Sequence, residues 1–343
     1  MTVPQTAPAA PNAGTPAIAP FERLQALVAA DMTAVNGLIR ERMASEHAPR
    51  IPAISAHLIE AGGKRLRPIL TLAAAQLCGY RGDHHIRLAA VVEFIHTATL
   101  LHDDVVDESE KRRGRPSANI LWDNKSSVLV GDYLFARAFQ LMVETGSLRV
   151  LDILSNAAAV IAEGEVLQLT TARDLGTDRA RYDKVIRGKT AALFAAATEV
   201  GGVISEAGEA RVAALRTYGD GLGMAFQLAD DLLDYGGTTA ALGKNAGDDF
   251  REGKVTLPII LAVERGDAAA RAFWDRTIVH AEQSDGDLEE ALERLRGTGA
   301  LDDTLAAARA HGAAAVGALE AFEPGPMRAA LTDIAEFVTD RLS

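Results

Sequence analysis

The sequence contains one cysteine, no long apolar run and no excess of basic residues, and each shortage excludes a class of protein. With Cys78 alone, the chain can form neither an internal disulfide nor a cysteine-rich metal site, which favours a reducing compartment, the cytoplasm. No run of about 18 or more apolar residues occurs, so any membrane contact is expected to be peripheral. Residues 1–20 are rich in Ala and Pro without the basic start of a signal peptide, which predicts a disordered tail.

Basic residues are outnumbered by acidic ones, 35 to 47, and the net charge is -12. Nucleic-acid surfaces need clustered Lys and Arg to neutralise phosphates, so a nucleic-acid partner is not expected. If a phosphate compound is the ligand, the protein must also recruit a cation.

Apolar residues recur at helical spacing from Phe21 onward, and Ala and Leu are abundant. This pattern predicts an all-α fold with one helical domain over residues 21–343. The main predicted helices span residues 21–45, 51–60, 68–78, 84–108, 126–145, 148–171, 178–204 and 208–235. Breaks fall where Gly and Pro collect, as in "AGGKRLRP" and "KRRGRPS".

Two aspartate clusters share the spacing DDxxD. The first comprises Asp103, Asp104 and Asp107, and the second comprises Asp230, Asp231 and Asp234. On a helix the first and last aspartates of each cluster are i,i+4 neighbours on one face, where like charges repel and a cation is expected. Carboxylate oxygens suit magnesium, which is often completed by substrate phosphates.

A single cluster of this kind could equally be a solvated acidic helix end. Two copies favour a site, because each follows an apolar stretch, "FIHTATLL" or "GMAFQLA". Basic residues in Gly-rich breaks could bind a second anionic group; they are Lys64, Arg65 and Arg67, the run 111–115, Lys189, Lys244 and Lys254. Together these features predict a ligand with a diphosphate head and an apolar tail, and a reaction that releases diphosphate.

The motifs "GGKRLRP", "HTATLLHDDVVDES", "RRG", "GKT", "FQLADDLLDY" and "GKNAGDDFREGKVTLP" resemble, in content and order, those of the trans-isoprenyl diphosphate synthases, also called polyprenyl synthetases. The resemblance implies a bundle of about ten or more helices around a central apolar cavity, and a homodimer. It implies that magnesium, three ions with bound diphosphate, is ligated by Asp103, Asp107 and Asp230 and supported by Asp104, Asp231 and Asp234. It implies isopentenyl diphosphate binding by Lys64, Arg67, His96 and Arg113. Contacts to the allylic substrate, farnesyl or geranyl diphosphate, are implied for Arg112, Lys189 and Lys244, and stabilisation of the allylic cation for Thr190 and Gln227.

Product length is predicted from the positions one helical turn before Asp103. They are the small residues Ala98 and Thr99, where short-chain members of the family carry bulky aromatics. Phe135, Phe139 and Met142 are spaced to form one bulky stripe on the next helix, with Phe139 as a candidate tunnel floor. This pattern predicts an octaprenyl to decaprenyl product of the kind used for quinone side chains.

Several alternatives to a long-chain synthase remain open at this point. They are a shorter-chain geranylgeranyl synthase, a non-catalytic synthase subunit, a cyclase, and a His-Asp phosphohydrolase suggested by His102 beside Asp103. The second aspartate cluster is unexplained by a phosphohydrolase, and a subunit released from catalysis is expected to lose one cluster.

Overall fold

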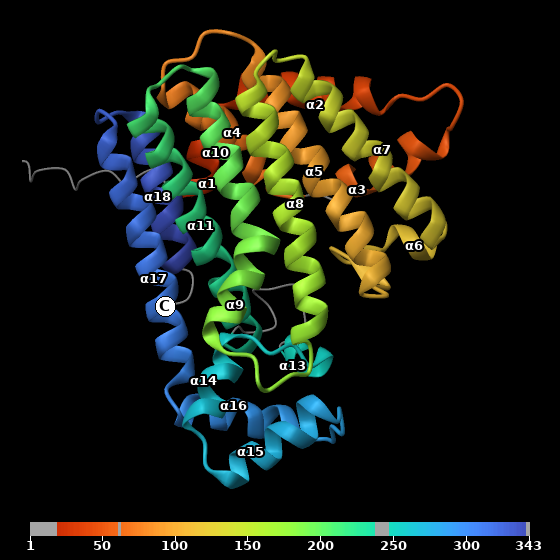
Figure 1. Ribbon diagram of the computed structural model, residues 1–343, viewed down its shortest axis with the longest axis vertical. Helices are drawn as coiled ribbons and strands as arrows, with labels where there is room; N and C mark the ends of the chain where they lie inside the picture. The colour runs from red at the N-terminus through yellow and green to blue at the C-terminus, as the bar shows by residue number, and fades with distance from the viewer. Residues whose placement is uncertain (1–18, 61–62, 237–246, 341–343) are drawn as a thin grey trace, which may run out of the picture.

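The structure, a computed structural model, describes residues 19–60, 63–236 and 247–340, and nearly all regular structure in these ranges is helical (Figure 1). The first eight helices are α1 (Pro20–Leu27), α2 (Ala29–Met43), α3 (Arg50–Glu60), α4 (Leu66–Leu77), α5 (His84–Val106), α6 (Ala118–Leu121), α7 (Asn124–Val143) and α8 (Leu148–Thr171). They are followed by α9 (Arg179–Ile186), α10 (Ala192–Ile204), α11 (Glu209–Gly236), α13 (Asp248–Glu252), α14 (Leu257–Arg265), α15 (Ala268–Trp274), α16 (Asp287–Gly297), α17 (Ala300–Ala318) and α18 (Pro326–Asp340). The prediction of an all-α fold is confirmed.

Shorter elements join these helices. They are the π-helical turns η1 (Arg187–Ala191) and η2 (Asp275–Val279), the 3₁₀ turn η3 (Leu319–Ala321), and the strands β1 (Lys111–Arg112) and β2 (Arg115–Pro116). None of the helices in the described ranges is both long and apolar enough to cross a bilayer.

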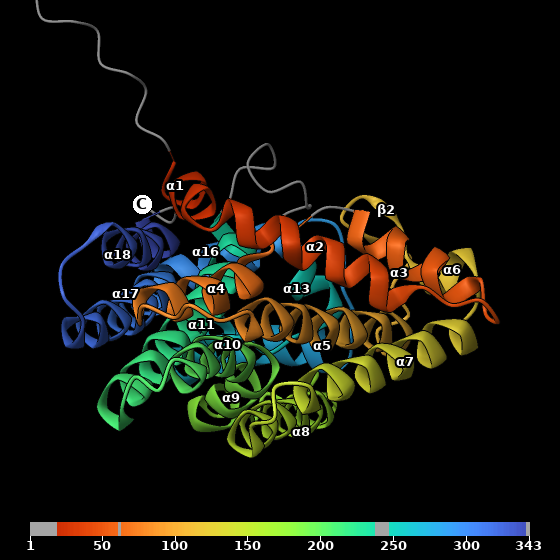
Figure 2. The same ribbon diagram turned by 90° about the horizontal axis from the view of Figure 1, so that it is seen from above.

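Helices α10 and α11 lie at the centre of the bundle. They pack against each other, α10 also contacts α4, α5 and α8, and α11 also contacts α17. Seen from above, α2 and α8 lie on opposite sides of this centre (Figure 2). Helices α14, α15 and α16 form the lower end of the molecule in Figure 1. The two central helices are thus surrounded by other helices of the bundle.

The interior consists of two apolar clusters that share helix α11. Leu222, Ala225 and Ala229 belong to the larger cluster, whereas Met224 and Leu228 belong to the cluster formed with α13 to α17. Because its two faces are buried on different sides, α11 is apolar over more than a single stripe. The second DDxxD motif is the last part of this helix.

Two predicted helices are divided in the structure. The helix expected over 21–45 breaks at Val28, whose N–H donates to the Gln25 carbonyl oxygen at 3.3 Å, because α1 packs against α18 while α2 packs against α5. The helix expected over 178–204 contains the π-helical turn η1 between α9 and α10. Residues 1–18 of the predicted tail lie outside the described ranges, and α1 begins at Pro20, whose fixed φ suits a first helical turn.

Candidate active site

The first aspartate cluster forms the end of α5, where its three carboxyl groups have different surroundings. The Asp104 side chain is fully buried and accepts a hydrogen bond from Nε of Arg112 at 2.7 Å. Asp103 is half-buried and Asp107 is exposed. The structure therefore leaves Asp103 and Asp107 on the accessible side of α5 and gives Asp104 a supporting position.

A hairpin of two short strands returns Arg112 to this cluster. Lys111 and Arg112 pair with Pro116 and Arg115, and the turn between them has positive φ at both central residues, Arg113 (52°) and Gly114 (76°). Two such residues suit the twist of a tight hairpin. The guanidinium of Arg113 lies over Gly63, where an added Cβ would come within 2.6 Å of Nη1, so a larger residue at position 63 would shift this guanidinium.

In the second cluster, Asp231 and Asp234 are also occupied by protein contacts. Asp231 is buried and accepts hydrogen bonds from the Tyr182 hydroxyl and from Nε2 of Gln227. Asp234 accepts from the backbone N–H groups of Asp248 and Asp249, at 3.1 and 3.0 Å, and thereby holds the start of α13.

Asp230 differs from these two residues because its side chain is exposed. The described structure thus leaves Asp103, Asp107 and Asp230 as the accessible members of the two motifs.

Lys254 connects the two clusters electrostatically. Its ammonium group lies 3.4 Å from Asp249 Oδ1 and 2.6 Å from Glu252 Oε2. Although burial opposes its charge, the carboxylates of Asp249, Glu252 and also Asp107 raise the Lys254 pKa. Since Asp107 directly follows α5 and the Asp249 N–H bonds Asp234, both acidic motifs lie near Lys254.

The raised pKa values of the crowded carboxyl groups show that their negative charge is only partly compensated. Burial, and then the neighbouring charge of Glu165, raises the Asp103 pKa to about 7. Burial and the charge of Asp249 raise the Asp234 pKa to about 6. A carboxyl group is shifted this way when its charged form lacks sufficient compensation, and a bound cation would supply it.

The donor set fits magnesium. In the described ranges, no three His, Cys, Asp or Glu side chains are grouped closely enough to hold a metal ion by themselves. Magnesium in proteins is commonly held by one or two carboxylates with substrate phosphates and waters as further ligands, and the accessible carboxylates of Asp103, Asp107 and Asp230 offer oxygens of this kind.

A basic group lies at the start of α4, beside α5. Arg67 is half-buried, its Nη1 lies 3.2 Å from His96 Nε2, and its guanidinium stacks over the Phe194 ring at 4.5 Å. Burial, and then the charge of Arg67, lowers the His96 pKa well below its ordinary value. His96 is therefore neutral at physiological pH, and its ring nitrogen accepts from Arg67.

A buried glutamate accompanies these arginines. Glu93 Oε1 accepts from Arg65 Nη1 at 2.8 Å, and its charge also acts on Arg67 and Arg113. Lys64 is exposed at the same loop. A single buried carboxylate thus offsets part of the repulsion among three arginines, and the group retains a net positive charge suited to an anion.

The π-helical turn η1 carries Lys189 and Thr190. Lys189 Nζ lies 3.0 Å from Glu165 Oε2 on α8, and the Thr190 hydroxyl donates to Gln227 Oε1 at 2.8 Å. A Cβ on Gly164 would lie 2.9 Å from the Lys189 backbone nitrogen, so glycine allows α8 to approach η1 this closely. Lys244, also predicted to bind substrate, lies outside the described residues.

The predicted chain-length residues have different exposures. Ala98 is fully buried, and Thr99 is half-buried with its hydroxyl donating to the His96 carbonyl oxygen at 2.8 Å. Phe135 is half-buried against the core, whereas Phe139 is 42% exposed on the surface of α7. Met142 is buried, so the three residues of the expected stripe differ in burial. The tunnel assignment stays a prediction.

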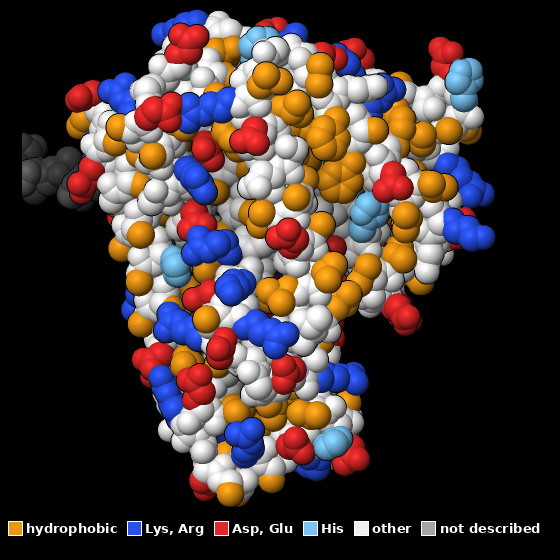
Figure 3. Space-filling model, viewed as in Figure 1, with side chains coloured by type: hydrophobic (Ala, Val, Ile, Leu, Met, Phe, Trp, Pro, Cys, Tyr) orange, Lys and Arg blue, Asp and Glu red, His pale blue; other side chains and the backbone are white. Residues whose placement is uncertain are grey.

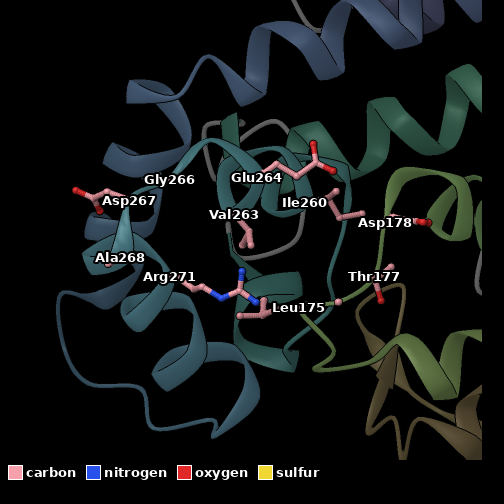
Figure 4. A pocket seen from close by; sticks show the side chains of 11 residues that line it. Leu175, Thr177, Asp178, Ile260, Val263, Glu264, Gly266, Asp267, Ala268 and Arg271 are labelled. Carbon is pink, nitrogen blue, oxygen red and sulfur yellow. The ribbon is translucent and has the colours of Figure 1, made fainter.

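A separate cavity of about 380 Å³ lies between the loop that follows α8 and the corner of α14 and α15 (Figure 4). Arg271 points into it between Val263 and Leu175. Its lining contains none of the motif aspartates.

The family model for polyprenyl synthetase matches residues 48–295, which include both aspartate clusters, the hairpin and η1. The chain belongs to the polyprenyl synthetase family. The predicted family, and with it the prenyltransferase class, is therefore confirmed.

Individual polyprenyl synthetases resemble the chain over nearly its whole length. An octaprenyl diphosphate synthase of Escherichia coli is 44% identical, covering 94% of this chain and 99% of its own. A crystal structure of a decaprenyl diphosphate synthase from Rhodobacter capsulatus is 63% identical, with a TM-score of 0.92 and coverage of 94% and 99%. A polyprenyl synthase from Caulobacter crescentus, complexed with calcium and isoprenyl diphosphate, is 54% identical, with a TM-score of 0.89 and coverage of 94% and 98%. The names of the first two relatives agree with the predicted long-chain product.

Sequence reasoning missed three residues of this polyprenyl synthetase site. Glu93 is the only charged residue in the apolar run "AAVVEFI", and that isolation was a usable signal. Glu165 and Tyr182 lie outside the aspartate motifs, and only their contacts with Lys189 and Asp231 reveal them.

Proposed function

We propose that the chain condenses isopentenyl diphosphate head to tail onto an allylic diphosphate, repeatedly, to give octaprenyl to decaprenyl diphosphate for quinone side chains. The observation that carries this proposal is the pairing of two accessible acidic motifs with a separate basic group around Arg67. One diphosphate would be held through metal at Asp103, Asp107 and Asp230. The other would be held by Lys64, Arg67 and Arg113, with His96 orienting Arg67.

In the proposed reaction, the bond between the allylic carbon and the diphosphate oxygen breaks, and the electron pair leaves with diphosphate. The double bond of isopentenyl diphosphate then attacks the cationic carbon, and a proton is lost to the departing diphosphate. Magnesium, when bound, would neutralise the charge on the leaving group. Arg112, Lys189 and Lys244 add positive charge there, and the oxygens of Thr190 and Gln227 face the allylic cation.

We also propose that the enzyme is a homodimer formed through α7 and α8. Large apolar side chains are exposed on both helices, with Leu129 66% and Val143 64% exposed on α7 and Leu148 82%, Val166 63% and Leu169 60% exposed on α8. Figure 3 shows hydrophobic side chains gathered over these helices. Apolar patches of this extent are typical of protein interfaces, and a symmetric dimer would bury the same face of both copies.

The single cysteine fits a cytoplasmic location.

The proposed function is tested by incubating the purified protein with isopentenyl diphosphate, magnesium, and either farnesyl or geranyl diphosphate. Product lengths are then measured by chromatography. We expect chains of 40 to 50 carbons, which correspond to eight to ten isoprene units. A 20-carbon product would instead identify a geranylgeranyl synthase, whereas consumption of the allylic substrate without elongation would identify a cyclase or phosphohydrolase. No turnover with either primer would favour a non-catalytic subunit.

A further inference from the structure

Beneath the second aspartate cluster, Tyr182 is joined to Gln227 through Asp231. The Tyr182 hydroxyl donates to Asp231 Oδ2, and Nε2 of Gln227 donates to Asp231 Oδ1 at 2.8 Å. The Thr190 hydroxyl donates to Gln227 Oε1, also at 2.8 Å. Tyr182, Asp231 and Thr190 are each no more than 5% exposed, so these hydrogen bonds are shielded from water.

The four residues come from three helical elements, α9, η1 and α11. Tyr182 lies on α9, Thr190 lies on η1, which follows α9 directly, and Gln227 and Asp231 lie one turn apart on α11. Residues at i and i+4 share a helix face, so the side chains of Gln227 and Asp231 lie close enough to form a hydrogen bond. A π-helical turn shifts the register of the residues after it, and such turns occur often at functional sites.

These contacts determine which way the Gln227 amide points. A side-chain amide has a donating NH₂ end and an accepting carbonyl end, whereas a carboxylate only accepts. Because the Tyr182 hydroxyl occupies one carboxylate oxygen of Asp231, the other is directed at Gln227 and takes its NH₂ group. The carbonyl oxygen of Gln227 must then face Thr190. The reversed amide would place two acceptors against each other.

We propose that Tyr182 is a positioning residue that, through Asp231, holds the carbonyl oxygen of Gln227 toward the allylic carbon. The identity of the reacting carbon rests on the proposed function. A carbonyl dipole directed at a developing cation stabilises the transition state without reorganisation during the reaction. Tyr182 touches neither substrate in this arrangement and acts only through the hydrogen bonds to Asp231 and Gln227.

The test is a double-mutant cycle of Tyr182→Phe and Gln227→Leu. We expect Tyr182→Phe to lower kcat about tenfold, since loss of one buried hydrogen bond misplaces the carbonyl, with KM for both substrates within about twofold of wild type. In the Gln227→Leu background, Tyr182→Phe should lower kcat no further. Wild-type kcat in Tyr182→Phe, or full additivity of the two changes, would overturn the inference.

Tyr218→Phe is the matched control. Tyr218 is also fully buried, and its hydroxyl donates to the Leu331 carbonyl oxygen at 2.8 Å, between α11 and α18. This variant should keep kcat within about twofold of wild type, because it removes an equivalent hydroxyl that has no link to Gln227. Equal losses of kcat in Tyr182→Phe and Tyr218→Phe would show a general packing effect and contradict the inference.

Thermal unfolding of the same variants tests the hydrogen-bonded chain without substrate. Tyr182→Phe and Gln227→Leu should together lower the unfolding midpoint by less than the sum of their separate effects, because both bond Asp231. Additive shifts would count against the inference even in a fully active enzyme. Non-additive shifts in a chain that does not elongate would count against the proposed function alone.

Discussion

Replacing Asp103 by Asn should stabilise the metal-free fold while nearly abolishing turnover. Burial and the nearby charge of Glu165 raise the Asp103 pKa to about 7, from an ordinary value of 3.8. At pH 8 the carboxylate is charged in both the folded and the unfolded chain, but the folded surroundings disfavour that charge. Asparagine has nearly the same shape and no charge, so Asp103→Asn removes the penalty.

The size of the effect follows from the pKa difference between the two states. Three pKa units correspond to about 4 kcal/mol, and because Asp103 retains contact with solvent, screening reduces this to about 1–3 kcal/mol. The folded chain binds the proton more tightly than the unfolded chain, so the penalty is largest above pH 7 and is lost as the pH falls from 7 toward 4. The gain in stability should therefore be clearly smaller at pH 5 than at pH 8.

The assay is denaturant unfolding of wild type and Asp103→Asn at pH 8 and pH 5, in the presence of a chelator. Glu163→Gln is the matched control, because Glu163 is an exposed carboxylate on α8, and it should leave the free energy of unfolding unchanged. Turnover of Asp103→Asn should fall by orders of magnitude, since a proposed metal ligand is lost. A variant that is less stable than wild type at pH 8, or equally stabilised at both pH values, would refute the reasoning.

Three further predictions concern metal, product length and assembly. Removal of divalent cations should abolish elongation, and added magnesium should restore it; activity that persists in chelator would contradict the metal requirement. Asp230→Ala should lower kcat by orders of magnitude while the far-UV circular dichroism stays unchanged. Ala98→Phe should shorten the product to about 15 to 20 carbons, whereas Phe139→Ala should lengthen it. Because Ala98 is fully buried, Ala98→Phe should also cost about 1–3 kcal/mol of stability. Full-length product from Ala98→Phe would show that the wrong helix face was assigned to the tunnel. Light scattering should give the mass of two chains, and Leu129→Lys should shift it toward one; a wild-type monomer at working concentration would rule out the dimer.

The aspartate motifs show how far local sequence reasoning extends. The i,i+4 spacing of Asp103 and Asp107 needs only helical geometry, and the apolar stretch before them already predicted a helix, which α5 confirms. The spacing does not distinguish Asp103 from Asp104, since both belong to one motif. Asp104 differs because Arg112 reaches it, and Arg112 lies on the β1–β2 hairpin that follows α5.

Helix breaks also divide into those that local sequence predicts and those that depend on tertiary packing. The glycine and proline signals located most helix ends within a few residues, because those residues act on the backbone near them. The break at Val28 had no such signal. It occurs where α1 and α2 begin to pack on different helices, α18 and α5, and α18 lies about three hundred residues further along the chain.

The sequence by itself determined the all-α class, the family and the residue types of the site, because helical periodicity and motif spacing are properties of neighbouring residues. Only the tertiary structure decided which contacts hold the supporting carboxylates: Arg112, Tyr182 and backbone N–H groups hold Asp104, Asp231 and Asp234. It also revealed Glu93 among three arginines. Burial and charge pairing between residues far apart in the chain set these roles, and neither quantity is encoded in local spacing.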